Sequence, residues 1–400
     1  MIVRRRNYDL SARNTFRMKV RCALYIELKE EADLPALDWD ALPQPVMVLG
    51  GGSNLLFTRD FPGTVLHFAG GGTDTMPAGE VGAIFGRGRI LSCLPRPENV
   101  PSMGLEANND GRGDSHEIPP RPLNLSPASL SASGDFLATV PAGVVFDDFC
   151  AWAASEGLWG PENLSLIPGE VGASAVQNIG AYGVEAKDIL AGIRAWDRVE
   201  RRFVDIDPAS CAYGYRSSRF KTEWKNRYVI TAVTYRLSRA PQPKLDYGGI
   251  RKALACHSER SEESLTPQVI RDTIIEIRRK KLPDPAELGS AGSFFCNPVI
   301  SREHFAQIVK TAREDNGPDY QVPHYEVGDQ IKVPAAWMIE QCGFKGRRHG
   351  GAQVYPGQPL VIVNASGSAT PEEIIGLENC IIQAITDKYG ITLHPEVEHI

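Results

Sequence analysis

The sequence lacks long hydrophobic runs. No apolar stretch of about 18 residues or more occurs in the 400-residue chain, so we expect no membrane span. The N-terminal segment Met1–Asn7 is basic, but no apolar run follows it, and we expect no secretory signal peptide. Lys and Arg number 43 against 49 Asp and Glu, which gives a formal net charge of −6. This balance argues against general binding of nucleic acid.

Paired cysteines and nucleotide fingerprints are also missing. The eight cysteines, spread from Cys22 to Cys380, form no C-x-x-C pair and no cluster with histidine. We therefore expect no metal site and no disulfide framework, and a reducing, cytoplasmic location. The glycine-rich segments carry no Walker lysine and no G-x-G-x-x-G at the start of a predicted helix, so neither standard nucleotide fingerprint fits.

The length and composition predict a globular protein with several domains. Hydrophobic residues make up 42% and charged residues 23% of the chain, which is ordinary for a folded protein. At about 150 residues per domain, two or three domains are expected. From about Gly289 the pattern changes to alternating strands and helices. We place structural units at 1–62, 63–285 and 286–390, and a C-terminal strand at 391–400.

Periodicity and turn residues predict the secondary structure. Strands are expected at 20–28, 46–49, 64–68, 137–142, 191–197, 202–205, 228–236 and 360–363. Helices are expected at 146–154, 267–280, 302–314, 334–342 and 371–388. Two polar segments without periodicity, about 86–134 and 255–264, are interpreted as insertions, the first of them mostly disordered. A lid or a partner site is the alternative for the first.

Two glycine-rich segments give the strongest indication of a ligand site. Glycine and other small residues recur from Ile167 to Gly183, and Gly50–Asn54 directly follows a predicted strand. Glycine is costly in regular structure, but it permits a positive φ and a close approach of the backbone to a ligand. Backbone N–H groups exposed in this way can bind phosphates. The pattern therefore predicts a cofactor site, and with it an enzyme.

Three further segments could carry chemistry. Tyr213–Lys221 combines two tyrosines and two arginines around a glycine turn, and Ser290–Pro298 places a serine at a tight turn. His394–Val397 adds a glutamate near the C-terminus. Taken singly, each has an ordinary alternative: a basic surface loop, a structural serine or a solvated carboxylate. Positive charge at Lys332 and Lys345 also fits a solvated face.

Taken together and in order, these segments resemble the UDP-N-acetylenolpyruvoylglucosamine reductase family, the flavin enzymes of peptidoglycan precursor synthesis. The matching motifs span nearly the whole chain apart from the two insertions. They are Asn14–Phe16, Leu49–Phe57, Glu162–Gly183, Tyr213–Ser218, Lys281–Pro285, Ala291–Phe295, Ala335–Gly346 and Pro395–Val397.

The resemblance implies both a fold and an activity. The fold would be α+β, with a two-part FAD-binding region of the PCMH or vanillyl-alcohol-oxidase type followed by a smaller α/β substrate-binding domain. The activity would be a monomeric, FAD-dependent reductase that uses NADPH as hydride donor. It would convert UDP-N-acetyl-enolpyruvoylglucosamine, a UDP-sugar, to UDP-N-acetylmuramate.

The resemblance also implies roles for individual residues. Arg216 and Glu396 match the residues that stabilise the enolate, and Ser293 matches the proton donor that follows hydride transfer from flavin N5. The matches to FAD contacts lie in both glycine-rich segments. They are Gly50, Gly51, Gly52, Ser53, Asn54, Pro168, Gly169, Val171, Gly172, Ala173, Ser174, Asn178, Gly180, Ala181 and Gly183. The matches to substrate contacts are Tyr247, Lys281, Asn297, Lys332 and Lys345.

Other hypotheses remain open from the sequence. Another FAD-dependent oxidoreductase could share only the cofactor region, but the motifs around Ser293 and Lys345 speak against it. A non-catalytic flavin-binding protein would not need Arg216, Ser293 and Glu396 together. A scaffold built on the segment 86–134 would need no cofactor at all.

Overall fold

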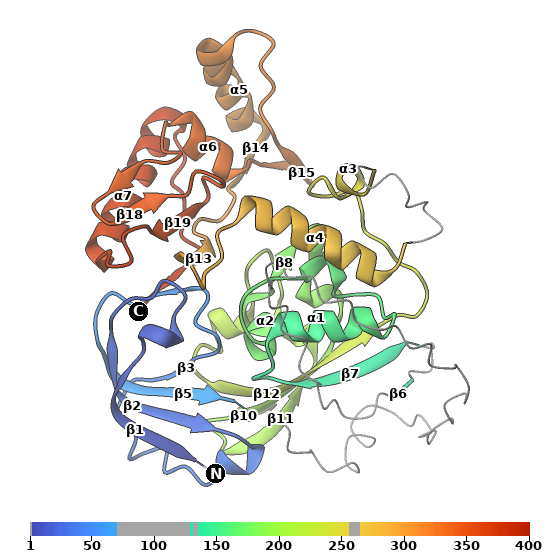
Figure 1. Cartoon of the computed structure of the whole chain (residues 1–400), viewed down its shortest axis with the longest axis vertical. Coiled ribbons are helices and arrows are strands. Elements are labelled where there is room, and N and C mark those ends of the chain that lie inside the picture. Colours follow the sequence, from blue (N-terminus) through green and yellow to red (C-terminus); the bar gives the residue numbers. More distant parts are fainter. Residues whose placement is uncertain (1, 70–128, 131–134, 256–264) are drawn as a thin grey trace, which may run out of the picture.

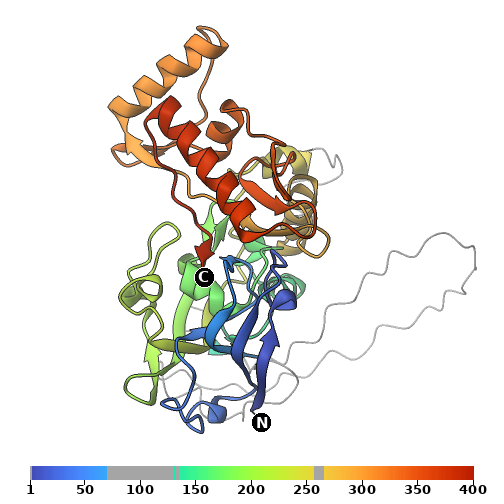
Figure 2. The ribbon, with the colours of Figure 1, turned by 90° about the vertical axis from the view of Figure 1, so that its left-hand side faces the viewer.

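The structure is a computed structural model of the whole chain, and it describes residues 2–69, 129–130, 135–255 and 265–400. Two sheets lie side by side, and the C-terminal third packs above them (Figure 1). The C-terminus returns to the junction of these parts, between the sheets and the C-terminal third (Figures 1 and 2). The observed mixture of helices and sheets is the α+β fold that the sequence predicts.

The first sheet is built from the N-terminal residues and has the strand order β1-β2-β5-β3. Its strands are β1 (Val3–Asp9), β2 (Arg21–Leu28), β3 (Val46–Val48) and β5 (Phe61–Phe68). β1 runs antiparallel to β2, whereas β2 and β3 both run parallel to β5. Two short 3-10 turns, η1 (Ser11–Arg13) and η2 (Glu31–Asp33), lie in the connections. β3 therefore delivers the chain directly to the glycine-rich segment that follows it.

The second sheet has the strand order β11-β10-β12-β7-β6, and its paired strands all run antiparallel. The strands are β6 (Ser129–Leu130), β7 (Phe136–Pro141), β10 (Leu190–Asp197), β11 (Arg202–Ile206) and β12 (Tyr228–Leu237). Three helices cover one face of this sheet (Figure 1): α1 (Phe146–Ser155), α2 (Val171–Gln177) and α4 (Pro267–Lys281). The apolar side of α1 is buried, as the spacing of its apolar residues predicts.

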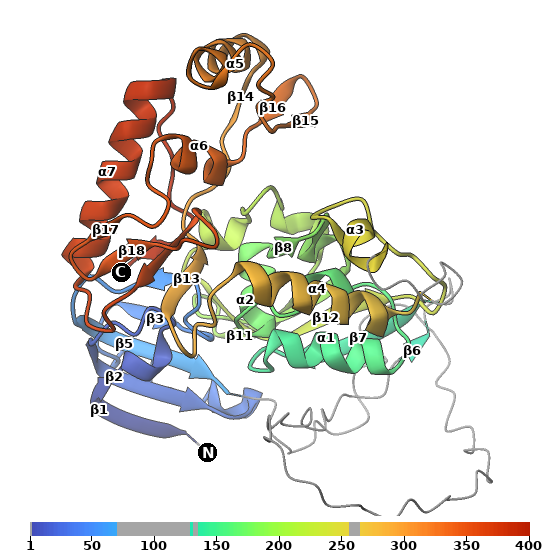
Figure 3. The ribbon, with the colours of Figure 1, turned by 45° about the horizontal axis from the view of Figure 1, so that its top comes forward.

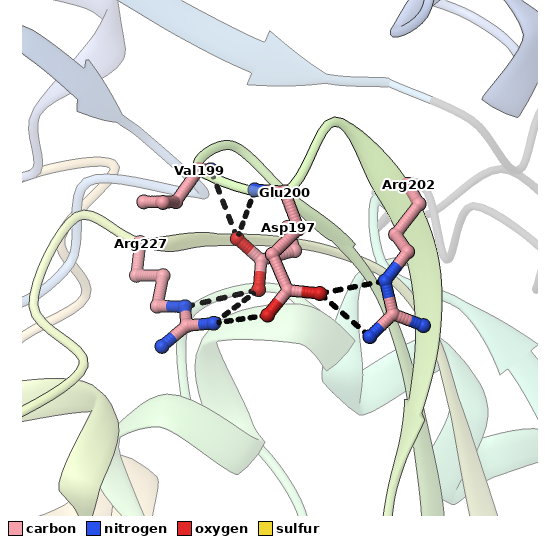
Figure 4. Close-up of polar contacts among 5 residues, drawn as sticks. All are labelled: Asp197, Val199, Glu200, Arg202 and Arg227. Carbon is pink, nitrogen blue, oxygen red and sulfur yellow. Dashed lines mark hydrogen bonds and ion pairs between the residues drawn. The ribbon is translucent and has the colours of Figure 1, made fainter.

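Asp197 fixes the turn between β10 and β11 and joins it to the start of β12 (Figure 4). Its buried carboxylate accepts hydrogen bonds from the backbone amides of Val199 and Glu200 at 2.9 and 3.1 Å. Arg227 donates to the same carboxylate from Nε and Nη2 at 2.9 and 2.7 Å. Arg202 bonds to Glu200 at 2.7 Å. Burial alone would raise the pKa of Asp197, but these hydrogen bonds outweigh it and lower that pKa.

The C-terminal third contains two smaller sheets. The first has the order β13-β19-β18-β17 and is packed against α6 (Ala335–Gln341) and α7 (Pro371–Tyr389). Its strands are β13 (Gly289–Ser293), β17 (Arg348–His349), β18 (Ala352–Val354) and β19 (Val361–Asn364). The second sheet, of β14 (Val299–Ser301), β15 (Tyr325–Val327) and β16 (Gln330–Lys332), projects together with α5 (Arg302–Asn316) (Figure 3).

Several short elements connect these layers. A parallel pair joins β4 (Leu55–Leu56) to β20 (Glu398–His399), so the last strand of the chain pairs with the first unit. The remaining elements are β8 (Gly180–Ala181), β9 (Val184–Glu185), α3 (Ile250–Ala255), η4 (Glu162–Leu164), η5 (Ala186–Asp188), η6 (Pro208–Cys211) and η7 (Arg219–Lys221).

Each helix and strand that the sequence predicts is present, with bounds that differ by a few residues at most. β1, α2, α3 and the short strands were not predicted. A strand of two or three residues carries no measurable periodicity, and the glycine-rich sequence of α2 is interpreted as a ligand-binding segment rather than a helix. Of the expected insertion at 86–134, only Ser129–Leu130 are described, and they form β6 rather than disordered chain. Of the insertion at 255–264, Ala255 ends α3. The rest of both segments lies outside the described residues.

The apolar cores cross the expected division of the chain. One core fills the space between the second sheet, α1 and part of the first sheet. Another joins N-terminal residues such as Phe16, Leu56 and Phe57 to Phe294 and Ile362 of the C-terminal third. The units at 1–62, 63–285, 286–390 and 391–400 remain a prediction, and β5 extends across the first division. Among the described residues, no helix is long and apolar enough to cross a membrane.

Candidate active site

A cavity of about 340 Å³ lies between the first and second sheets. Its walls come from β3 and Gly50–Asn54 on one side and from α2 on another. The segment 220–226 and the C-terminal residues 398–400 complete the lining. Both glycine-rich segments of the sequence therefore contribute to one cavity.

The two glycine-rich segments are in direct contact. Ser53 Oγ donates a hydrogen bond to the carbonyl of Pro168 at 3.1 Å. A Cβ atom added to Gly51 would lie 3.1 Å from Cα of Gly169, closer than ordinary packing allows. Gly52 has a φ of 62°, and a Cβ atom there would lie 2.1 Å from the carbonyl oxygen of Arg13. Small residues are required here because backbone packs on backbone.

The segment Gly50–Asn54 presents unpaired backbone donors. Across the described parts of the chain, the amides of these five residues donate no hydrogen bond to another residue. A run of free N–H groups beside a cavity forms a site for an anion such as a phosphate. The segment thus fits the diphosphate of a dinucleotide cofactor, because its amides are free and its first three residues are glycines.

The other residues matched to FAD contacts occupy two different settings. Gly172 and Ala173 line the cavity, whereas Val171 and the hydroxyl of Ser174 are buried in the packing of α2. The side chain of Asn178 bonds to Glu185 and to the carbonyl of Gly214. Three further residues lie on or beside the β8–β9 hairpin and extend the cofactor segment toward the arginine described next. They are Gly180, Ala181 and Gly183.

Arg216 and Glu396 form a shielded ion pair. The guanidinium Nε of Arg216 lies 2.9 Å from Oε1 of Glu396. Nη2 of Arg216 donates to the carbonyl of Gly180 at 2.6 Å. A Cβ atom at Gly180 would lie 2.8 Å from Nη1, so glycine at this position makes room for the guanidinium. Arg216 itself has a φ of 53°, a conformation that only a few per cent of non-glycine residues adopt.

The surroundings of Glu396 raise the pKa of its carboxyl group. Burial raises the pKa of this carboxyl, and the positive charges of Arg216 and Lys221 oppose the rise without cancelling it. Lys221 also donates a hydrogen bond from Nζ to the backbone carbonyl of Arg216 at 3.1 Å. Since Lys221 lines the cavity, a third charged group connects the cavity to the ion pair.

The segment that contains Ser293 pairs through its backbone with the tail that contains Glu396. It is the exposed last residue of β13 and follows Gly292, whose φ is 71°. The next residue, Phe294, accepts a hydrogen bond from the amide of Glu396 at 2.8 Å. The C-terminal tail therefore runs alongside the segment that contains the serine. Glu396 is hydrogen-bonded to the residue that directly follows Ser293.

Asn54 connects this pairing to the glycine-rich segment. Its Nδ2 donates to the carbonyl of Glu396 at 3.0 Å. Its own carbonyl accepts from the amide of Glu398 at 3.0 Å. The glycine-rich segment, the C-terminal tail with Glu396, and the backbone next to Ser293 are thus linked by hydrogen bonds.

Three of the five predicted substrate residues lie in a linked group. Asn297 Nδ2 donates to the hydroxyl of Tyr215 at 3.2 Å. Nζ of Lys332 lies 5.1 Å from the centre of the Tyr215 ring and 5.6 Å from that of Tyr325. The rings of Tyr247 and Tyr325 are stacked, with centroids 5.4 Å apart and planes at 16°. This aromatic group bridges the β15–β16 hairpin to the second unit, next to Arg216.

The other two predicted substrate residues do not join this group through any contact in the described chain. Lys281 is exposed at the end of α4. Lys345 pairs with Glu340 at 2.7 Å, and both side chains are 46% exposed. Among the described residues there is no group of three or more His, Cys, Asp or Glu side chains that could hold a metal ion.

Sequence reasoning missed Lys221 and Tyr325. Lys221 ends the same segment as Arg216, and a cation so close to a candidate catalytic arginine could have been noticed. Tyr325 gave no signal, because a single tyrosine in a short polar strand looks like any surface residue. Its position becomes informative only when Tyr247 and Lys332 lie beside it.

Comparisons with known proteins show which family this chain resembles. The model of the C-terminal domain of UDP-N-acetylenolpyruvoylglucosamine reductase matches residues 284–400, and an FAD binding domain matches residues 128–201. The protein of that reductase name from Bacteroides fragilis strain YCH46 is 37% identical over 396 residues, covering 98% of this chain and 99% of the relative. One from Porphyromonas gingivalis strain ATCC 33277 is 38% identical over 401 residues, covering 99% of both chains.

A solved structure shares the fold. The crystal structure of UDP-N-acetylenolpyruvylglucosamine reductase from Thermus caldophilus aligns with a TM-score of 0.58 at 18% identity. The alignment covers 100% of this chain and 98% of the other. At this identity the likeness concerns the fold alone.

Proposed function

Because the chain belongs to the UDP-N-acetylenolpyruvoylglucosamine reductase family, we propose that it reduces the enolpyruvyl ether of a UDP-sugar to the lactyl ether, with NADPH as the electron source. The product would be UDP-N-acetylmuramate. The reaction adds a hydride to the terminal carbon of the enolpyruvyl group and a proton to the neighbouring carbon.

The cofactor's part in this reaction is redox chemistry. When bound, FAD would supply the hydride-transfer chemistry that connects NADPH to the substrate. The free amides of Gly50–Asn54 fit its diphosphate, and the glycines leave room for close approach. The chain's own residues would bind, orient and protonate, as the following steps describe.

Arg216 would stabilise the negative charge that develops on the substrate. Hydride addition to the terminal carbon creates an enolate next to the substrate carboxylate, so charge accumulates on both. A guanidinium stays protonated and can bind a carboxylate with two nitrogens. Arg216 is already oriented by Glu396 and by the carbonyl of Gly180. Its Nη1 donates no hydrogen bond to the described residues and is available to the substrate. Fixed donors of this kind lower the barrier because they need no rearrangement during the reaction.

Glu396 would act in its protonated form as a hydrogen-bond donor to the developing enolate. A carboxylate would repel that charge, so the raised pKa of Glu396 is what this role needs. Burial provides the shift, and the two nearby cations limit it.

Ser293 would deliver the proton. A hydroxyl is a weak acid in water, but it can protonate a strongly basic enolate that is held within hydrogen-bond distance. The serine ends β13 at a glycine turn, exposed, beside the strand-like pairing of Phe294 with Glu396. Because the serine is exposed, its hydroxyl is accessible to a substrate.

The UDP part of the substrate would lie against the linked group around Tyr215 and Tyr325. Lys332 offers positive charge to a diphosphate, and Asn297 offers an amide that is already oriented by Tyr215 and by the backbone amide of Ala335. Tyr247 would cover the bound nucleotide together with Tyr325. Lys281 and Lys345 are kept as further candidates for the diphosphate.

The Arg216–Glu396 pair, joined to the glycine-lined cavity through Lys221 and Asn54, is the observation that carries the proposal. The direct test is to purify the protein, measure FAD uptake, and follow NADPH oxidation with the UDP-enolpyruvyl sugar. We expect oxidation that depends on this substrate, and none with a UDP-sugar that lacks the enolpyruvyl group. A protein that takes up no FAD, or that oxidises NADPH equally with both sugars, contradicts the proposal.

A further inference from the structure

Glu170 places a carboxylate beside the free backbone amides of Gly50–Asn54. It follows Gly169, it lines the cavity, and its side chain is only 14% exposed. A Cβ atom at Gly50 would lie 3.3 Å from Oε2 of Glu170, so this oxygen packs directly against the glycine-rich segment. A shielded negative charge at a site for a dianionic group needs an explanation, because like charges repel most strongly where water is excluded.

One oxygen of this carboxylate is held by a buried histidine. Nε2 of His67, on β5, lies 3.0 Å from Oε1 of Glu170. Nδ1 of the same ring lies 3.1 Å from the hydroxyl of Tyr25 on β2. With a carboxylate as its partner, Nε2 must carry the proton, which fixes the tautomer if the ring is neutral. The Tyr25 hydroxyl also lies 3.5 Å from Oε2 of Glu27.

The other oxygen of Glu170 is left for a ligand. In the described parts of the chain, Oε2 has no hydrogen-bond donor, although Oε1 is fixed by His67. The donors of FAD are the hydroxyls of its ribose and ribityl chains, the adenine amino group and the N3–H of the flavin ring, whereas its phosphates are acceptors. The hydroxyl-bearing chains directly flank the diphosphate, and Oε2 of Glu170 packs against the segment that fits the diphosphate, so a hydroxyl is the donor nearest to this oxygen. Such a charge-assisted hydrogen bond is among the stronger ones in proteins.

We propose that Glu170, held in place by His67 and Tyr25, accepts a hydrogen bond from a hydroxyl of bound FAD, on either its ribose or its ribityl chain. This inference rests on the proposed function, since it requires FAD in the cavity. The amides of Gly50–Asn54 then bind the diphosphate, and Glu170 accepts a hydrogen bond from a neighbouring hydroxyl. His67 holds the carboxylate away from the phosphates.

The test measures FAD affinity of the apoprotein by flavin fluorescence, without turnover. Glu170→Ala should weaken FAD binding by about tenfold or more. Glu170→Gln keeps a carbonyl oxygen as acceptor and should bind within a fewfold of the wild type. Glu223→Ala serves as the control, since Glu223 is 67% exposed and pairs with Arg219 at the surface. Glu170→Met, which keeps the bulk, replaces the alanine variant if that variant does not fold.

A second arm identifies the hydroxyl. FMN carries the ribityl chain but no ribose, so a loss of affinity that appears with both flavins assigns the ribityl chain. A loss that appears with FAD alone assigns the ribose. In either case, His67→Ala should reduce FAD affinity, and His67→Gln, whose amide can donate from the position of Nε2, should restore much of it.

Two outcomes overturn the inference. One is an alanine or methionine variant that binds FAD as the wild type does. The other is tighter binding by Glu170→Gln, which would mean that the charge opposes the phosphates. Failure of the wild-type protein to bind FAD is a different result, and it counts against the proposed function instead.

Discussion

Nε of Arg216 lies 2.9 Å from Oε1 of Glu396, and this pair joins a turn of the second unit to the C-terminal tail. The tail reaches this position by pairing with Phe294 and with β4. The site is therefore complete only when three distant parts of the chain are folded together. Loss of the last residues would remove both the carboxyl and the strand that holds it.

Arg216→Lys tests the two-nitrogen contact of the guanidinium. Lysine keeps the charge and the same backbone strain at a positive φ, but it cannot hold Glu396, Gly180 and a substrate carboxylate together. We expect the rate of substrate reduction to fall by about 10²–10³-fold. Arg202→Lys, at the surface hairpin of Figure 4, is the matched control and should keep full activity. Equal rates for the two variants would contradict the role of Arg216.

Ser293→Ala should separate the two half-reactions. Flavin reduction by NADPH needs no proton from Ser293 and should proceed at the wild-type rate. Oxidation of the reduced enzyme by the enolpyruvyl substrate should slow by about 10²–10⁴-fold, the usual contribution of a positioned acid. Stopped-flow absorbance of the flavin measures both steps. Normal turnover by this variant would show that another group donates the proton.

Substrate reduction should become slower at high pH. The pKa of Glu396 is raised by burial, and the protonated form that acts as donor is lost as the pH rises through that raised pKa. Lys221→Gln removes a positive charge that lowers the pKa of Glu396, so the falling limb of the rate should move to higher pH. Lys225→Gln, a neighbour that also lines the cavity, is the comparison. An unchanged pH profile in Lys221→Gln would remove Lys221 from the electrostatics of the site.

Gly52→Ala should destabilise the protein and weaken FAD binding together. A Cβ atom at Gly52 would lie 2.1 Å from the carbonyl of Arg13, in addition to the cost of a positive φ. Gly157 has a similar φ of 69° with nothing within 4 Å, so Gly157→Ala isolates the backbone cost, about 1–2 kcal/mol. We expect a larger loss of unfolding free energy for Gly52→Ala, and FAD affinity reduced only there. Equal losses in the two variants would show that the clash relaxes.

Tyr325→Ala tests the aromatic group over the substrate. Tyr325 stacks on Tyr247 and lies near Lys332, so its loss should raise the KM for the UDP-sugar while leaving flavin reduction unchanged. Val327→Ala, on the same strand and 43% exposed, is the control and should change neither. An unchanged KM in Tyr325→Ala would place the nucleotide elsewhere.

Acid should destabilise the contact between α1 and α4. Burial raises the pKa of Asp147, but Arg271 outweighs it and holds that pKa below its usual value. The stability from this pair is present above the unfolded pKa and is lost as the pH falls through the lower folded pKa. Nη2 of Arg271 lies 2.9 Å from Oδ2 of Asp147, and Arg271→Met should cost about 3–5 kcal/mol at neutral pH. Melting curves against pH would contradict this if both proteins lost stability equally in acid.

The sequence by itself determined the local structure wherever the signal lies within a few residues. Helix α7 is an example: Thr370 and Glu373 form a capping box at its start, and Gly390 ends it in a left-handed conformation. The glycine-rich segments likewise predicted a close backbone contact, and the order of the motifs along the chain identified the family. These signals can be read because helix periodicity, caps and turns depend on neighbours along the chain.

Tertiary structure alone decided which residues meet. The amide of Glu396 donates a hydrogen bond to the carbonyl of Phe294, the residue after Ser293, and this bond places the tail beside the serine segment. The position of Tyr325 becomes informative only beside Tyr247 and Lys332. Glu170 looked like any polar residue in a turn until His67 and Gly50 were found on either side of it. The physical reason is that strand pairing and burial bring together residues that are far apart in the sequence. The residues on either side of a group therefore do not indicate which distant residue it will contact.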